Sequence, residues 1–186
     1  MIQKFYLSAN EYLLDSCRLA RQILDSGWRP DDLLALWRGG TPVAVMVHEF
    51  LYYHGLRPNH RPVKCQSYMD INARASKVVF ECAEDVFASM RPGEKVLVID
   101  DVFDSGHTAA AVLEKLLPLG VDVKLAMVYW KPNKNQTALR PDFYVRETDD
   151  WIVFPHEMQG LTPDEVKLKD PVIYALLADS VKNASV

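Results

Sequence analysis

Short apolar runs alternate with helical repeats along this chain. Runs typical of buried strands occupy residues 33–37, 62–68, 96–99 and 123–130, and two shorter ones occupy residues 142–145 and 151–154. Apolar residues at helical spacing follow at residues 43–55 and 109–117, and an opening helix is predicted to end at Gly27. Strands that alternate with helices predict an α/β fold, a mostly parallel twisted sheet flanked by helices on both faces.

Capping signals predict where three helices begin. Ser8 with Glu11, and Thr162 with Glu165, have the spacing of a capping box. Asp170 precedes a proline and predicts the cap of a closing helix. Residues 69–77 have no apolar period, so we expect a mobile loop there.

Composition favours one core and excludes several classes of protein. With 186 residues, of which 49% are hydrophobic, the chain has apolar material for a single domain over residues 1–186. A net charge of −4 argues against a nucleic-acid partner, since binding to a phosphate backbone needs a basic face. No apolar run approaches about 18 residues, so we expect a soluble protein without a membrane span.

The cysteines indicate a reducing compartment. Cys17, Cys65 and Cys82 lie far apart, form no C-x-x-C pair and are odd in number. This pattern indicates neither a disulfide framework nor a zinc site. We therefore expect a cytoplasmic protein.

The clearest candidate site follows the apolar run at residues 96–99. Asp100 and Asp101 come directly after the run, and residues 105–108, Ser-Gly-His-Thr, open the next helix. Unpaired N–H groups and the helix dipole favour an anion at such a helix start, and Gly106 lets the loop close tightly. Paired carboxylates beside it suit vicinal hydroxyls and a hard cation.

These residues resemble a known motif. The stretch VLVIDDVFDSGHTAAAVLEKL is similar to the phosphoribosyl pyrophosphate (PRPP) motif of type I phosphoribosyltransferases. The resemblance implies that Asp100 and Asp101 engage the ribose hydroxyls, directly or through Mg²⁺, the expected cofactor. It also implies that the 5-phosphate is wrapped by Ser105, Gly106, His107 and Thr108.

A second segment resembles the pyrophosphate loop of the purine branch of that family. LLALWRGGTPVAVMVHEFL reads as a strand, Arg-Gly-Gly and a helix. The resemblance implies that Arg38, Gly39 and Gly40 contact the pyrophosphate group of PRPP. In the family this loop can contain a non-proline cis peptide.

A third set of residues resembles the purine-recognition segments of bacterial xanthine-guanine and hypoxanthine-guanine phosphoribosyltransferases. The two segments that show this resemblance are VYWKPN and DDWIVFPHEMQG. The resemblance implies that Lys131 donates to the purine O6, Trp151 stacks on the base and Ile152 offers backbone groups to its edge. Asp104 matches the position that faces N7 and is the expected catalytic acid–base. Residues 133–140 form a longer segment than the compact xanthine-guanine enzymes have there.

The resemblance also implies the remaining architecture. A core at about residues 28–130 carries the PRPP site, and residues 131–160 with the terminal segments form a small C-terminal hood. Ser67 and Tyr68 match the start of the family's flexible lid. Oligomers are usual in the family, so we expect a homodimer or homotetramer.

The implied activity is transfer of 5-phosphoribosyl from PRPP to a 6-oxopurine in purine salvage, with a nucleoside monophosphate and pyrophosphate as products. Two alternatives remain. One is a PRPP-binding regulator without turnover, against which the acidic balance and the base-recognition segments speak. The other is a phosphoribosyltransferase for another base, such as a pyrimidine.

Overall fold

A computed structural model describes residues 4–68, 77–81 and 83–183, which pack into two compact units. The larger unit is Leu13–Asp149, and the smaller combines Met1–Tyr12 with Asp150–Val186. The single domain over residues 1–186, with its core and hood, stays a prediction.

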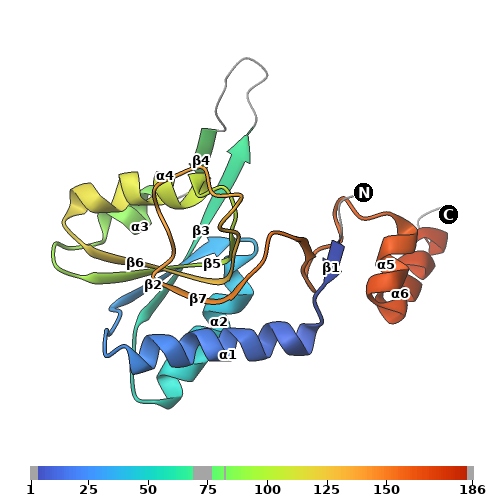
Figure 1. Ribbon diagram of the computed structural model, residues 1–186, viewed down its shortest axis with the longest axis horizontal. Helices are drawn as coiled ribbons and strands as arrows, with labels where there is room; N and C mark the ends of the chain where they lie inside the picture. Colours follow the sequence, from blue (N-terminus) through green and yellow to red (C-terminus); the bar gives the residue numbers. More distant parts are fainter. Residues whose placement is uncertain (1–3, 69–76, 82, 184–186) are drawn as a thin grey trace. The chain divides into compact units, whose positions relative to one another are not determined.

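The larger unit is an α/β layer structure. Its helices are α1 (Ala9–Asp25, which begins in the smaller unit), α2 (Gly40–Tyr53), α3 (Glu84–Ala88), α4 (His107–Leu116) and the 3₁₀ turn η1 (Leu117–Leu119). Its strands are β2 (Asp32–Trp37), β3 (Asn59–Tyr68), β4 (Lys77–Glu81), β5 (Lys95–Phe103), β6 (Asp122–Trp130) and β7 (Phe143–Glu147). Helices α1 and α2 cover one face of the sheet, and α3 and α4 cover the other (Figure 1). The predicted α/β fold is confirmed.

The order of the strands creates a switch point in the middle of the sheet. The order is β4-β3-β2-β5-β6-β7, and every neighbouring pair is parallel except β3 with β4. From β2 the chain crosses outward to β3, whereas β5 lies on the other side of β2 and leads on to β6. Open sheets of this kind bind ligands beyond the carboxyl ends of the two strands at the switch point. In this protein those strands are β2 and β5.

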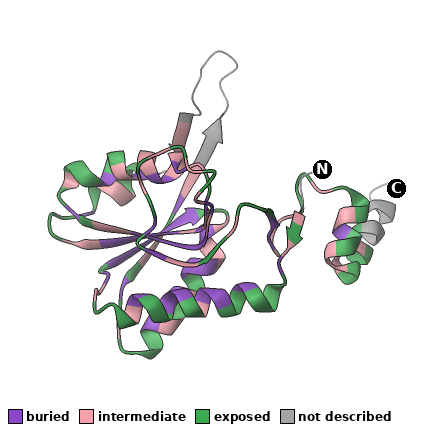
Figure 2. Ribbon diagram, in the orientation of Figure 1, coloured by how far each residue is buried: buried purple, intermediate pink, exposed green. Residues whose placement is uncertain are grey.

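Apolar residues of the central strands form the core. All of residues 33–36 and 96–99 are buried, as strands covered on both faces require, and the buried residues gather on the sheet (Figure 2). On the face under α4, Leu34 and Leu36 pack in one cluster with Ala109, Val112 and Leu116 of that helix. The helical spacing of the last three residues predicts this face.

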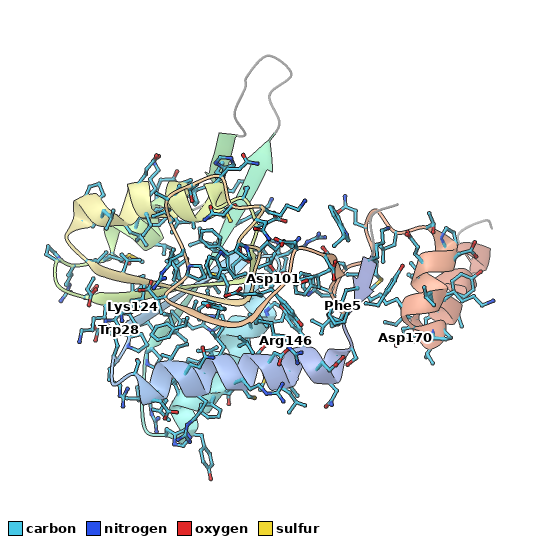
Figure 3. All side chains as sticks on the ribbon, viewed as in Figure 1. Phe5, Trp28, Asp101, Lys124, Arg146 and Asp170 are labelled. Carbon is cyan, nitrogen blue, oxygen red and sulfur yellow. The ribbon has the colours of Figure 1, made fainter. Side chains whose placement is uncertain are left out.

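A buried carboxylate fastens α1 to the sheet. Asp15 is 0% exposed and accepts hydrogen bonds from Arg146 Nε at 2.7 Å and Nη2 at 3.1 Å. Arg18 Nη1 donates to the same carboxylate at 2.5 Å, and the Tyr129 hydroxyl lies 3.4 Å from it. Figure 3 shows Arg146 beside α1. Charge-assisted bonds from two guanidinium groups compensate the burial of this acid.

The smaller unit joins the two ends of the chain. Strand β1 (Lys4–Tyr6) pairs in parallel with β8 (Trp151–Val153), and α5 (Pro163–Lys169) and α6 (Pro171–Asn183) follow. The predicted capping box of Thr162 and Glu165 is confirmed, and Asp170 caps α6 by accepting from the amides of residues 172 and 173. None of the described helices has the length and apolar character needed to span a bilayer.

Three details differ from the sequence predictions. Strand β5 does not end at Ile99 but runs through both acids to Phe103, because its parallel pairing with β6 continues to Trp130. Strand β1 was not predicted, and β8 pairs with it instead of joining the main sheet. The loop expected at residues 69–77 lies outside the described residues except for Lys77, which belongs to β4.

Candidate active site

Two loops meet at the switch point, one after β2 and one within and after β5. The peptide bond between Trp37 and Arg38, at the end of β2, is cis. The Thr41 amide then donates to the Arg38 carbonyl at 3.2 Å, and α2 begins at Gly40. The Arg-Gly-Gly segment turns against β5 at residues 99–101, inside that strand.

The two glycines of this turn allow a close approach to β5. A Cβ atom at Gly39 would lie 2.0 Å from the Asp101 Oδ2, and one at Gly40 would lie 2.2 Å from the Ile99 carbonyl oxygen. Both distances are far below van der Waals contact, so a side chain at Gly39 would displace the Asp101 carboxylate and one at Gly40 would displace the backbone of β5. The loop that the sequence assigns to pyrophosphate thus lies against the acid pair that it assigns to ribose.

Asp100 and Asp101 form a desolvated pair of carboxylates. Asp101 is 8% exposed, and its amide donates to Asp100 Oδ1 at 2.9 Å. Loss of hydration raises the pKa of Asp100 well above its usual range, and the neighbouring charge of Asp101 raises it further. A bound cation would relieve both effects. Adjacent carboxylates fit Mg²⁺, which prefers one or two carboxylates together with phosphate oxygens.

Cys65 offers no nucleophile to this site. Burial raises the pKa of the Cys65 thiol to about 12, and the charge of Asp100 adds to the effect. The thiol therefore stays protonated at neutral pH, and only a thiolate would be reactive.

The loop after β5 surrounds a cavity of about 200 Å³. Gly106 adopts the left-handed conformation, with φ of 83°, and caps α4, whose first residue is His107. The site residues that line the cavity are Asp100, Asp104, Ser105, Gly106 and Thr108. Unsatisfied N–H groups of the first helical turn make this cavity suited to an anion.

Lys131 and Asp104 form an ion pair beside the cavity. Lys131 Nζ lies 2.9 Å from Asp104 Oδ2, and the Lys131 amide donates to the Phe103 carbonyl at 2.9 Å. The lysine side chain is 8% exposed, whereas that of Asp104 is 49% exposed. The two residues that the resemblance assigns to the purine are therefore adjacent, with the carboxylate on the side of solvent.

The remaining predicted residues belong to the smaller unit or end β3. Ile152 is buried in β8 and pairs with Phe5, while Trp151 is 53% exposed. Within the smaller unit, a cavity of about 250 Å³ is lined by Trp151 together with Lys4 and residues 157 and 159–161. Ser67 and Tyr68 end β3 opposite residues 78 and 77, and their side chains lie outside the described part of the structure.

Sequence reasoning missed one set of site residues, the turn at residues 135–137. The Gln136 amide donates to the Ser105 carbonyl at 2.9 Å, and Gln136 Oε1 lies 3.0 Å from His107 Nε2. The available signal was the length of the segment at residues 133–140, but length alone does not say what a segment contacts.

Residues 4–160 match the phosphoribosyl transferase domain family. The chain is similar to a xanthine-guanine phosphoribosyltransferase from Idiomarina loihiensis, with 28% identity over 159 residues, which are 84% of this chain and 88% of the relative.

Solved structures agree with this match. A purine phosphoribosyltransferase from Pyrococcus horikoshii has 27% identity and a TM-score of 0.66, over 86% of this chain and 97% of that one. A hypothetical protein from Neisseria gonorrhoeae with bound ppGpp has 24% identity and a TM-score of 0.74, over 92% and 98% of the two chains, and it shares the fold.

Proposed function

Because this chain belongs to the phosphoribosyl transferase domain family, we propose that it transfers 5-phosphoribosyl from PRPP to N9 of a 6-oxopurine and releases pyrophosphate. The acceptors are hypoxanthine, guanine or xanthine, and the product is a nucleoside monophosphate of purine salvage. The protein works in the cytoplasm as a homodimer or homotetramer.

The ion pair of Lys131 with Asp104 carries the proposal of a 6-oxopurine. The lysine ammonium has three N–H donors, so it can keep its bond to Asp104 and also donate to the purine O6. A 6-amino group offers no comparable acceptor to this buried lysine. Adenine is therefore a poor substrate, because its 6-amino group is a donor and cannot accept a hydrogen bond from the Lys131 ammonium as the O6 of a 6-oxopurine can.

Asp104 is the acid–base group. Its carboxylate is the more exposed member of the pair and lines the cavity at the start of α4. It lies beside N7 of the bound purine and accepts or shares a proton while N9 attacks C1′ of the ribose. Positioned acid–base groups contribute about 10²–10⁴-fold to such reactions.

Departure of pyrophosphate is assisted from the other side of the switch point. Arg38 and the amides of Gly39 and Gly40 bind the leaving polyanion, and Asp100 and Asp101 hold the ribose hydroxyls. When bound to these acids, Mg²⁺ supplies positive charge that neutralises the pyrophosphate. Groups held in place for charge that develops during the reaction act without reorganisation.

The base and the reacting bond are enclosed by two further segments. The Trp151 ring stacks on the purine, and Ile152 presents backbone groups to its edge; stacking of this kind contributes about 1–3 kcal/mol per base. The segment that begins with Ser67 and Tyr68 closes over PRPP and excludes water that would hydrolyse it.

The test is release of pyrophosphate by the purified protein from PRPP and Mg²⁺, with hypoxanthine, guanine, xanthine, adenine, uracil and orotate offered separately. Turnover with one or more 6-oxopurines, and little with adenine, supports the proposal and ranks the bases. Turnover only with a pyrimidine would assign another base. Binding of PRPP without turnover on any base would instead identify a regulator.

A further inference from the structure

The turn at residues 135–137 lies directly against the loop that opens α4. Besides the bond from the Gln136 amide to the Ser105 carbonyl, two side chains of the turn reach Gly106. A Cβ atom at Gly106 would lie 2.5 Å from Thr137 Oγ1 and 2.8 Å from Asn135 Oδ1. The turn therefore leaves no room for a side chain at Gly106.

Hydrogen bonds inside the turn fix its shape. Thr137 donates to Asn135 Oδ1 through its amide and its hydroxyl, both at 2.9 Å. Asn135 Nδ2 donates to the Leu139 carbonyl at 2.7 Å, and the Leu139 amide donates to Thr137 Oγ1 at 3.2 Å. Thr137 Oγ1 thus acts both as a donor and as an acceptor, and both of its bonds close the turn.

The segment is also held at its start. The Lys131 amide donates to the Phe103 carbonyl, and Asn133 donates to the Asp149 carboxylate through its amide and its side chain. The segment that contains the turn is therefore held in place at residues 131 and 133. The contacts of the turn with Ser105 and Gly106 restrain the loop at the cavity.

The direction of two carbonyl groups in the loop affects how well the loop can bind an anion. An N–H group stabilises a phosphate, whereas a carbonyl oxygen that faces the phosphate repels it. The Ser105 carbonyl is engaged by Gln136, and the Gly106 carbonyl is engaged by the Ala110 amide at 2.9 Å. With both oxygens bound elsewhere, the N–H groups of the loop can face the cavity.

We propose that the turn at residues 135–137 sets the affinity of this protein for the 5-phosphate of PRPP, with Gln136 and Thr137 as positioning residues. The inference rests on the proposed function, since it takes the cavity at α4 as the 5-phosphate site. Neither residue acts on the substrate. They hold Ser105 and Gly106 in the conformation that presents the N–H groups.

A matched pair of substitutions at Thr137 tests the inference. Thr137→Val keeps the shape of the side chain but removes both hydroxyl bonds, whereas Thr137→Ser keeps the hydroxyl. Thr137→Val is expected to raise KM for PRPP by about five- to tenfold, the factor that corresponds to one or two hydrogen bonds. KM for the purine should change less than twofold, and Thr137→Ser should restore the wild-type values.

Ribose 5-phosphate and pyrophosphate each represent one end of PRPP, so binding at the two ends can be measured separately. In calorimetric titrations of the intact protein, Thr137→Val should weaken ribose 5-phosphate by the same factor and leave pyrophosphate unchanged, because the Arg38 loop is not altered. Lys134→Ala, an exposed neighbour in the same segment, is the control and should behave as wild type. Equal weakening of both ligands, or an unchanged affinity for ribose 5-phosphate, would overturn the inference.

These titrations also keep the two proposals apart. If the wild-type protein turned over no base, the proposed function would fail. The difference between Thr137→Val and Thr137→Ser in binding ribose 5-phosphate would still decide the role of the turn.

Discussion

Two desolvated acidic regions of the larger unit have opposite surroundings. Asp15, a buried residue of α1, is compensated by Arg146 and Arg18. Asp100, within β5, has a second carboxylate as its neighbour, and its pKa is raised by desolvation and by that neighbour. The first region is complete as folded and stabilises the protein. The second has adjacent carboxylates and a raised pKa, a combination that is common at functional sites.

The largest effect is expected at Asp104, which belongs to the second region. Asp104→Ala should lower kcat by about 10²-fold or more and change KM for PRPP less than threefold, because the acid–base contribution is lost while the PRPP loops remain. Steady-state kinetics with both substrates measure this. Asp104→Asn, which keeps an acceptor for Lys131, controls for lost packing. An unchanged kcat in both variants would remove the acid–base role.

The same substitution, aspartate to asparagine, should have opposite effects on activity and stability in the two regions. Asp100→Asn should lower kcat/KM by about 100-fold while the free energy of unfolding is unchanged or higher, because a repelling charge is removed. Asp15→Asn should lower the free energy of unfolding by about 2 kcal/mol and change kcat/KM less than twofold. Urea unfolding and steady-state kinetics of the same preparations give both quantities. If both variants lost stability equally, the distinction would be wrong.

A smaller effect is expected at Trp151. Trp151→Ala should raise KM for the purine by about tenfold, since stacking contributes about 1–3 kcal/mol per base, and leave KM for PRPP nearly unchanged. Trp151→Phe should restore most of the loss. Equal rises in both KM values would show that Trp151 serves only to hold β8 in place.

The most subtle effect is the dependence of stability on pH. Because the pKa of Asp100 is raised in the folded protein, the folded state holds this proton more tightly than the unfolded chain does. Stability from this group is therefore present at low pH and is lost as the pH rises through the raised pKa. Asp100→Asn should gain stability relative to wild type as the pH rises, as measured by urea unfolding between pH 4 and about 8. A constant difference would contradict the raised pKa.

Much of the second region could be predicted from the sequence, because its residues follow one another along the chain. An apolar run, two acids and a short polar loop before a helix place Asp100 to Thr108 at one strand end. Patterns along the chain do not show that this strand end lies near Arg38, because that depends on the strand order. The prediction came from the resemblance to phosphoribosyltransferases, which the family match confirms. The close approach of Gly39 to Asp101 is visible only in the structure.

The first region could not be predicted, because two of its partners, Tyr129 and Arg146, are distant in sequence. Asp15 reads as an ordinary polar residue of a surface helix, and its partner Arg146 follows 131 residues later. The turn at residues 135–137 escaped prediction for the same reason, since its contacts with Ser105 and Gly106 depend on how β6 and β7 pack. Local patterns fix helices and strands, whereas contacts between loops depend on tertiary structure.

The pairing of β1 with β8 has a consequence for synthesis on the ribosome. Residues 4–6 emerge first, but their partner strand at residues 151–153 emerges only after the whole sheet of the larger unit has been translated. Domains generally fold as units during synthesis, so the larger unit can fold before the partner strand of β1 has been synthesised. Deletion of residues 4–6 would therefore remove the partner of β8, leaving the sheet and its switch point able to form.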